Sequence, residues 1–369
     1  MKGRRPFVAI TVLCWLYSAP FAEAQIDLSG TLDIGYKQDI GADADERSSQ
    51  INSSLKGLSP FSLVRSRIFA DAEVSENVNA FTTILFDQGL EHFDLEGAYL
   101  IFNAVSGRES VNLLAGKMAT AFGTFASRSF GTLNPLIGTP LLYQYFSSVH
   151  GSRVPAIYDA CWNTGLQVFG STSALTYAVA VTKGALSNPA ASDNDGAQFV
   201  GRLGIQPTMG WKLGLSGAYG PYLQAAAAED ADFSVDKSVE DFNQLAIGID
   251  AEYAVWHCEF FFELVRNQWD VPNVGDALSL TGGYVEGTIA IAPRLRYSLR
   301  LGSMVYDEID DGNGGQQAWD YDIRRAETGF EYYIDQNVRA KTVLQLNFRD
   351  DAAPGDDDHM IGFQLATIF

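Results

Sequence analysis

Apolar and polar side chains alternate with a period of two over most of the chain beyond residue 27. In the stretch 294–301, Arg and Ser alternate strictly with Leu and Tyr, and the stretches 62–74, 243–255 and 338–349 repeat the pattern. Successive side chains of a strand point to opposite faces, so each stretch predicts a strand with one polar and one apolar face. We therefore expect an all-β protein.

About sixteen such segments follow one another, and most are 9–15 residues long. Strands of soluble domains usually span about 5–6 residues, whereas tilted membrane strands span about 9–11. The predicted strands are 27–37, 61–75, 77–87, 92–105, 110–118, 160–170, 173–183, 197–207, 210–220, 242–256, 258–270, 278–292, 293–306, 320–334, 337–349 and 359–369. A soluble sandwich also alternates, so alternation alone leaves both classes open.

The connections between these segments decide between the two classes. The short ones lie near residues 75–76, 106–109, 171–172, 207–210, 256–258, 292–293 and 335–336. The long, polar ones are 38–60, 119–159, 184–196, 221–241, 271–277, 307–319 and 350–358, while 88–91 is a short exception. Short periplasmic turns and long external loops are typical of outer-membrane barrels. We therefore predict a transmembrane antiparallel β-barrel of about sixteen strands in a bacterial outer membrane.

The N-terminal residues predict a cleaved signal peptide. Two arginines and a lysine among the first five residues precede an apolar run over 7–17, and Ala22 and Ala24 supply the small side chains of a cleavage site. The run is well short of the about 20 residues that a spanning helix requires. We expect a signal peptide over 1–24 and a barrel over 25–369.

The chain is acidic, with 45 Asp and Glu against 25 Lys and Arg and a formal net charge of -20. This balance argues against nucleic acid as a partner, because a phosphate backbone attracts basic residues. The acids gather in the predicted external loops, as in 229–232, 307–311 and 350–358. They either solvate mobile loops or bridge to lipopolysaccharide through divalent cations. No spacing of Cys, His or acids indicates a metal site, and no cofactor is predicted.

The last predicted strand ends in Phe369 and carries Ile361, Phe363, Leu365 and Thr367 at alternate positions. This ending resembles the signal by which bacterial outer-membrane proteins are handed to the barrel-assembly machinery. The overall layout is similar to that of the sixteen-stranded porins.

A looser resemblance, to the phosphate-selective porin family, rests on residues 278–300. There Tyr284-Val285-Glu286-Gly287 is followed by Arg294, Arg296 and Arg300. The resemblance to porins implies a water-filled channel for passive diffusion, surrounded by outer-membrane lipid and lipopolysaccharide, and a homotrimer. The acidic balance departs from what an anion-selective pore would have.

In the porins that the chain resembles, the third external loop folds into the barrel and narrows it, and 119–159 would be that loop. It is aromatic, rich in glycine and proline, and free of acids from 119 to 158. Its basic residues and the one at its root are Arg128, Arg153 and Lys117. We expect these three to face Asp71, Glu73 or Glu96 across a constriction, or else to pair locally and hold the loop down.

Charged side chains at inward positions of the strands are expected to line the pore. The predicted lining residues are Arg65, Arg67, Asp71, Glu73, Arg294, Arg296, Arg300, Arg339 and Lys341. Acids on the same faces are Asp250, Glu252, Glu259, Glu263, Glu286, Glu327 and Glu331. The lining is either a set of ion pairs that stiffens the barrel or a basic stripe that draws anionic solutes.

We therefore predict a porin that passes small hydrophilic solutes or ions, with anions as one option. A non-conducting structural or adhesive barrel is the first alternative, and an absence of conductance would identify it. An outer-membrane hydrolase is the second. The chain has four His and neither a Gly-x-Ser-x-Gly elbow nor an HExxH helix, so we expect no enzyme activity.

Overall fold

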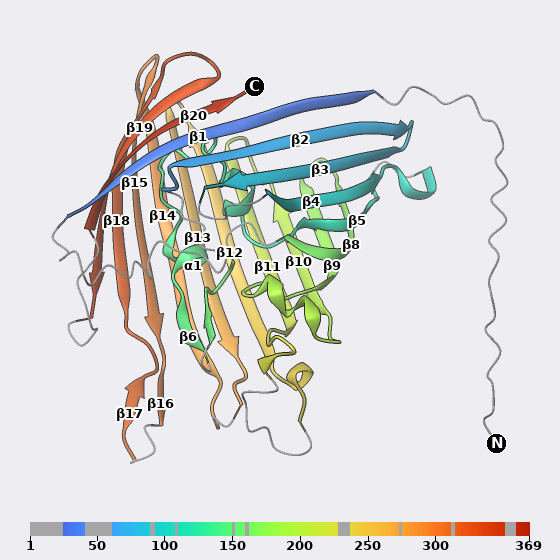
Figure 1. Ribbon diagram of the computed structural model, residues 1–369, viewed down its shortest axis with the longest axis vertical. Coiled ribbons are helices and arrows are strands. Elements are labelled where there is room, and N and C mark those ends of the chain that lie inside the picture. Colours follow the sequence, from blue (N-terminus) through green and yellow to red (C-terminus); the bar gives the residue numbers. More distant parts are fainter. Residues whose placement is uncertain are drawn as a thin grey trace.

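The computed structural model describes residues 25–40, 61–88, 93–107, 110–149, 152–158, 162–227, 237–272, 275–310, 314–350 and 359–369. Sixteen strands form a closed barrel in which every strand pairs with its antiparallel neighbours (Figure 1). The barrel closes where β1 pairs with β20, with Thr31 opposite Ile368 and Ile40 opposite His359. Among the described residues, no helix is long and apolar enough to cross a membrane.

The barrel strands run in chain order around the sheet. They are β1 (Ile26–Ile40), β2 (Val64–Ser75), β3 (Val78–Asp87), β4 (Phe93–Phe102), β5 (Asn112–Ala119), β8 (Trp162–Ser171), β9 (Leu175–Lys183), β10 (Gln198–Ile205), β11 (Trp211–Pro221), β12 (Asn243–Val255), β13 (Cys258–Trp269), β14 (Leu278–Ala292), β15 (Leu295–Tyr306), β18 (Ile323–Tyr333), β19 (Val338–Arg349) and β20 (His359–Ile368). Two small hairpins lie outside this sheet, β6 (Ser147–Val149) with β7 (Ser152–Val154) and β16 (Glu308–Asp310) with β17 (Gln316–Ala318).

The predicted fold class and strand order are confirmed, and the strand ends differ by a few residues. The largest differences are of three residues: β2 and β18 start later and β4 ends earlier than predicted, while β1 extends further, to Ile40. β4 stops at Phe102 because the chain turns soon afterwards. Ala104 adopts φ 51° and Gly107 φ 73°, a region that a strand cannot use. Short turns lie at one end of the barrel and long connections at the other, here called the short-turn and long-loop ends.

Large apolar side chains point outward and are exposed, which identifies the surface that meets lipid. On neighbouring strands β8 to β12 these are Leu166, Val168, Val179, Val181, Phe199, Leu203, Leu213, Leu215, Ile247 and Ile249. An exposed apolar surface that extends across so many strands is unusual for a soluble monomer. It is the apolar belt of a transmembrane barrel.

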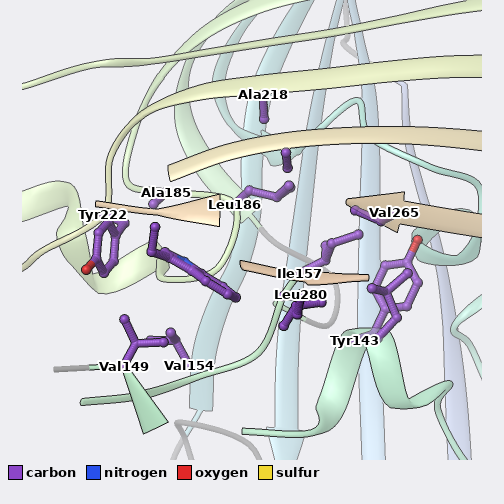
Figure 2. Close-up of a cluster of buried hydrophobic side chains, with 14 of the residues drawn as sticks. Tyr143, Val149, Val154, Ile157, Ala185, Leu186, Ala218, Tyr222, Val265 and Leu280 are labelled. Atoms are coloured by element: carbon purple, nitrogen blue, oxygen red, sulfur yellow. The ribbon is translucent and has the colours of Figure 1, made fainter. Parts of the chain in front are cut away.

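The interior at the long-loop end contains a packed apolar core. Residues 120–149 and 152–158, here called the inner loop, lie inside the barrel, and most of their described side chains are buried. Tyr143 and Ile157 of this loop lie beside Val265 and Leu280 of the barrel wall (Figure 2). The loop is thus packed against the wall as a core element.

A single helical turn in the inner loop, α1 (Leu141–Gln144), packs closely on β14 and β15. The wall provides room because it has glycines there. A Cβ built on Gly282 would lie 3.0 Å from Leu142 Cδ1, and one built on Gly302 would lie 4.0 Å from Leu141 Cδ1. The absence of side chains at these inward positions lets α1 approach the sheet.

Candidate pore and constriction site

A cavity of about 840 Å³ lies inside the barrel on the side that the apolar core leaves open. One wall comes from β2, β3 and β4, and the opposite wall from β8 to β12. The first part of the inner loop forms the third side, with exposed Ser127 and Leu133 among its residues. The cavity is therefore bounded by strand faces and by the inner loop.

Ion pairs line this cavity. Arg67 on β2 makes two hydrogen bonds to Glu96 on β4, of 2.7 and 3.0 Å, in the parallel geometry that suits guanidinium and carboxylate. Across the cavity, Arg202 on β10 pairs with Asp250 on β12 through a 2.5 Å contact. Opposite charges thus balance one another on both walls.

A third pair, Lys212 with Glu252, lies closer to the short-turn end, with an Nζ–Oε2 distance of 2.8 Å. The Lys212 side chain is 64% exposed, so water screens this pair strongly. The three pairs together give the cavity no net positive charge. The side chains of these three pairs therefore form an ion-paired lining, which is one of the two predicted arrangements.

Aromatic side chains form the wall between β2 and β4. Phe69 and Phe81 stack with ring centroids 6.2 Å apart, and Phe81 lies 4.9 Å from Tyr99. Phe130 of the inner loop meets Phe69 edge-on at 5.8 Å and lies 5.0 Å from the Arg67 guanidinium carbon. The inner loop is therefore attached to this wall by aromatic and cation–π contacts.

Arg128 is attached to the far wall of the barrel. Its guanidinium donates to Glu286 at 2.6 Å and to the Tyr284 hydroxyl at 3.2 Å, and lies 3.6 Å from the Phe261 ring centroid. Burial opposes this charge, but Glu286 outweighs it and raises the pKa of Arg128 above its ordinary value. Arg128 thus holds the loop down, which is the alternative that the sequence left open.

The predicted opposition between Arg128 and the acids of β2 and β4 is wrong. Glu96 pairs with Arg67, while Asp71 and Glu73 are exposed on β2 toward the short-turn end. Sequence spacing did not reveal which wall the loop would approach, because the loop crosses the lumen and meets β14 instead. The side chain of Arg153 lies outside the described residues.

Three of the predicted lining residues, Lys341, Arg339 and Arg300, bind the inner loop instead of facing solute. Lys341 donates to the carbonyls of Gly131 and Asn134. Arg339 donates to the carbonyl of Thr132. An irregular loop leaves its carbonyls without helix or sheet partners, and a buried unpaired carbonyl is costly. The basic side chains of β19 satisfy these groups.

Arg300 on β15 is the centre of this arrangement and is 1% exposed. It donates to Glu286 at 2.7 Å, to Glu327 at 2.9 Å and to the Gly138 carbonyl at 2.7 Å. Arg325, which the sequence analysis did not single out, donates to Thr139 O at 2.8 Å. These residues therefore do not form the predicted basic stripe, because their cations are paired with carboxylates and with carbonyls of the inner loop.

Lys117 faces away from the lumen. Its neighbour Met118 is buried inside the barrel, and Lys117 pairs with Ala98 in the outward row that includes Thr82. Its ammonium donates to the Leu95 carbonyl. The prediction of an inward Lys117 is wrong. Because β5 carries Leu113 and Leu114 in succession, the pattern of apolar residues does not show which face of the strand points inward.

The remaining predicted residues are distributed along the barrel. Arg65 pairs with Asp87 at 2.8 Å. Arg296 lies 3.7 Å from Glu259. Arg294 is exposed in a turn and donates to the Ile334 carbonyl at 3.4 Å.

Phe369 pairs with Gly30 through two backbone hydrogen bonds of 2.8 and 3.0 Å. Its side chain is exposed on the outer surface. Its role as an assembly signal stays a prediction.

A buried group of two tyrosines and Glu263, whose contacts the sequence did not reveal, completes the site. Tyr143 of the inner loop donates to Glu263 at 2.5 Å, and the Tyr284 hydroxyl donates to the same carboxylate at 3.2 Å. Burial, with the nearby carboxylate, holds the pKa of the Tyr143 hydroxyl well above its usual value. The alternation of inward and outward positions along β10 and β18 could have identified Arg202 and Arg325 as inward residues. It could not have identified the groups that they bind.

Comparison with known proteins supports the fold. No protein-family model matches the chain, and no curated protein matches it at the sequence level. A loop L8 deletion mutant of the outer membrane protein OmpT of Vibrio cholerae has a TM-score of 0.63 at 12% identity, over 94% of this chain and 99% of that one. A trimer form of OmpT is also among the similar structures.

Two further structures are similar over the same length. The anion-selective porin from Comamonas acidovorans has a TM-score of 0.62 at 10% identity, covering 94% of this chain and 100% of that one. The outer membrane channel DcaP of Acinetobacter baumannii has a TM-score of 0.59 at 14% identity, covering 94% and 97%. The comparisons identify no subfamily, so the resemblance to phosphate-selective porins stays a prediction. The chain has the closed sixteen-strand fold of bacterial outer-membrane porins.

Proposed function

We propose that this chain is an outer-membrane channel through which small hydrophilic solutes and ions diffuse passively. The observation that carries the proposal is the cavity between β2–β4, β8–β12 and the inner loop. It contains ion pairs at Arg67–Glu96 and Arg202–Asp250, which suit a water-filled path. The proposal assigns no catalytic step to the chain.

We propose that the channel favours cations weakly. The pairs along the cavity cancel, and the basic residues of β15, β18 and β19 are engaged with the inner loop. Asp27 and Asp71 lie directly opposite each other on β1 and β2, with Glu73 two residues further along β2. Among the described residues, no basic side chain forms an ion pair with these three acids. Their charge lies on the inner face near the short-turn end, where it repels anions.

A non-conducting barrel is the second candidate, and one observation favours it. The apolar core around the inner loop fills the lumen beside β12 to β18. If ions cannot pass beside this core, no current will flow.

Planar-bilayer recording of the refolded protein under a KCl gradient separates the two candidates. The channel proposal predicts stepwise conductance with a reversal potential of the sign that marks cation preference. Correctly folded protein without conductance would leave the structural barrel as the function. A reversal potential of the opposite sign would contradict the cation preference while leaving the channel intact.

We also propose that the barrel assembles as a homotrimer and that residues 1–24 are removed on export. The outward row Ala70, Thr82 and Ala98 on β2, β3 and β4 consists of small side chains. The outward positions beside this row on the same strands carry larger apolar side chains, Ile68, Ile84 and Leu100. A row of small side chains lets a second rigid barrel approach closely, which supports contact between barrels there. Cross-linking of the native membrane protein tests the trimer, and the mass of the mature chain tests the cleavage.

A further inference from the structure

A groove of about 590 Å³ is hollowed in the outer, lipid-facing surface of the barrel across β13, β14, β15 and β18. One row of paired positions across the strands forms the floor of this groove. Leu264, Gly283, Ser303, Arg324 and Phe348 are successive partners along that row. Gly283 and Ser303 are small, so the surface sinks between the large side chains at the two sides.

The neighbouring row makes the groove apolar on its deeper side. Phe262, Val285 and Leu301 pair in succession, and all three are exposed on the outer surface. Val305 adds an exposed apolar wall closer to the long-loop end. The groove thus offers apolar contacts over several residues along the strands, a length that suits an acyl chain.

Arg324 lines the groove at its long-loop end. Its neighbours Ile323 and Arg325 are buried inside the barrel at 0% and 3% exposure, so Arg324 points outward between them. Within the part of the chain that the structure describes, no carboxylate forms an ion pair with it. Arg266, also near this rim, is paired with Asp307 at 2.7 Å. Arg324 is therefore a cation on the outer surface that has no carboxylate partner among the described residues.

The position of this arginine within the membrane follows from its place in the strand. It is the second residue of β18 at the long-loop end, and long loops of such barrels face the outside. A lipid-facing arginine costs least near the interface, where it extends its guanidinium to the headgroups. A guanidinium binds a phosphate through parallel hydrogen bonds.

We propose that this groove binds a lipopolysaccharide of the outer leaflet, with an acyl chain along the groove and a phosphate on Arg324. Lipopolysaccharide is the occupant that fits, because its phosphates lie at the external headgroup level and its chains descend from there. The proposed contact needs no divalent cation, unlike bridging by the acidic loops. It is also independent of conduction by the lumen.

Native mass spectrometry of the refolded barrel tests this proposal. The barrel is offered equal amounts of a deep-rough lipopolysaccharide and phosphatidylglycerol, with EDTA present. We expect one lipopolysaccharide retained per wild-type chain. R324Q should reduce this occupancy by about ten-fold, the effect of losing a charge-assisted hydrogen bond.

Filling the groove separates the acyl chain from the phosphate contact. Ala326, which pairs with Leu301, also lines the groove, and A326W fills it while keeping the charge. S303L fills it in a second way, should A326W refold poorly. Either variant should reduce lipopolysaccharide retention. R294Q is the matched control, because Arg294 is exposed in a turn at the short-turn end, and should change nothing.

Equal retention by the wild type and R324Q would overturn the proposal. So would lipopolysaccharide that the wild type retains only in a parallel sample without EDTA, since the contact would then run through divalent cations. Phosphatidylglycerol retained in place of lipopolysaccharide would overturn the assignment of the occupant. The shift of each variant between folded and heat-denatured bands on gels shows that the barrel is intact in every sample.

Discussion

Lys341 connects β19 to the inner loop, and its removal should release that loop. The side chain is 4% exposed, and its ammonium points at the carbonyls of Gly131, Asn134 and Leu136. An ammonium has three N–H donors, so this arrangement uses all of them. K341M keeps the length of the side chain and removes every donor.

The magnitude follows from the carbonyls that lose their partner. A buried acceptor left without a hydrogen bond costs about 1–3 kcal/mol. The carbonyl of Leu136 is the most distant at 3.4 Å, so two close contacts dominate. With partial relaxation of the loop, we expect docking to weaken by about 3 kcal/mol. Since 1.4 kcal/mol is about a factor of ten, the undocked population rises roughly 150-fold.

The rate of trypsin cleavage in the folded barrel measures the undocked population. Cleavage after Arg128 requires the inner loop to leave the wall, because that side chain is largely buried against Glu286. Where undocking is fast compared with cleavage, the rate follows the undocked population. We therefore expect cleavage at Arg128 to be about 150-fold faster in K341M than in the wild type.

The matched control is K37M. Lys37 pairs with Asp39 at 3.6 Å and has a side chain that is 31% exposed. Within the described part of the chain, it forms no ion pair with the inner loop. Its cleavage rate should equal that of the wild type. If K341M is cleaved at the wild-type rate while its barrel is folded, then Lys341 does not hold the loop.

Further changes test other contacts of the inner loop. E286Q removes the carboxylate between Arg128 and Arg300 and should lower the free energy of unfolding by about 3–5 kcal/mol. E259Q, in a more exposed pair, should change this free energy by at most about 1 kcal/mol. Equal shifts in the two denaturation curves would refute this ordering. G282V should displace α1 and speed cleavage at Arg128, whereas G287V, which lies beside the exposed Phe260 on the outer surface, should not. Glu240 accepts a hydrogen bond from the Asp195 N–H, which holds its pKa below the ordinary value. A lowered pKa stabilises the fold above the unfolded value and ceases to do so as the pH falls through the folded value. The local stability of the 237–242 segment, followed by hydrogen exchange, should therefore fall on acidification, and E240Q should abolish that pH dependence.

The barrel could be predicted from the sequence because its signals are local and repeated. Alternation in stretches such as 294–301 reports which face a side chain occupies, and turn length reports which end of the barrel a connection lies on. Both arise from the geometry of one strand and its neighbour. The end of β4 differs because Ala104 turns the chain out of the sheet, which alternation does not reveal.

The partners inside the lumen could not be predicted in the same way. Parity shows that Arg300 and Lys341 face inward, but their partners are carbonyls of a loop more than 150 residues away in the chain. Lys117 was misplaced because the two faces of β5 are similar in polarity. Contacts across a barrel depend on the path of the inner loop, and that path is set by packing on glycine positions such as Gly282.

The most direct test asks whether current passes through the cavity beside the inner loop. Ser127 is exposed and lines this cavity, while Ser75 is exposed at a short turn outside it. In a background with Cys161 and Cys258 replaced by Ser, S127C or S75C is modified with a positively charged methanethiosulfonate during single-channel recording. We predict that modification lowers the conductance of S127C and leaves that of S75C unchanged. An unchanged current through fully modified S127C would contradict the account.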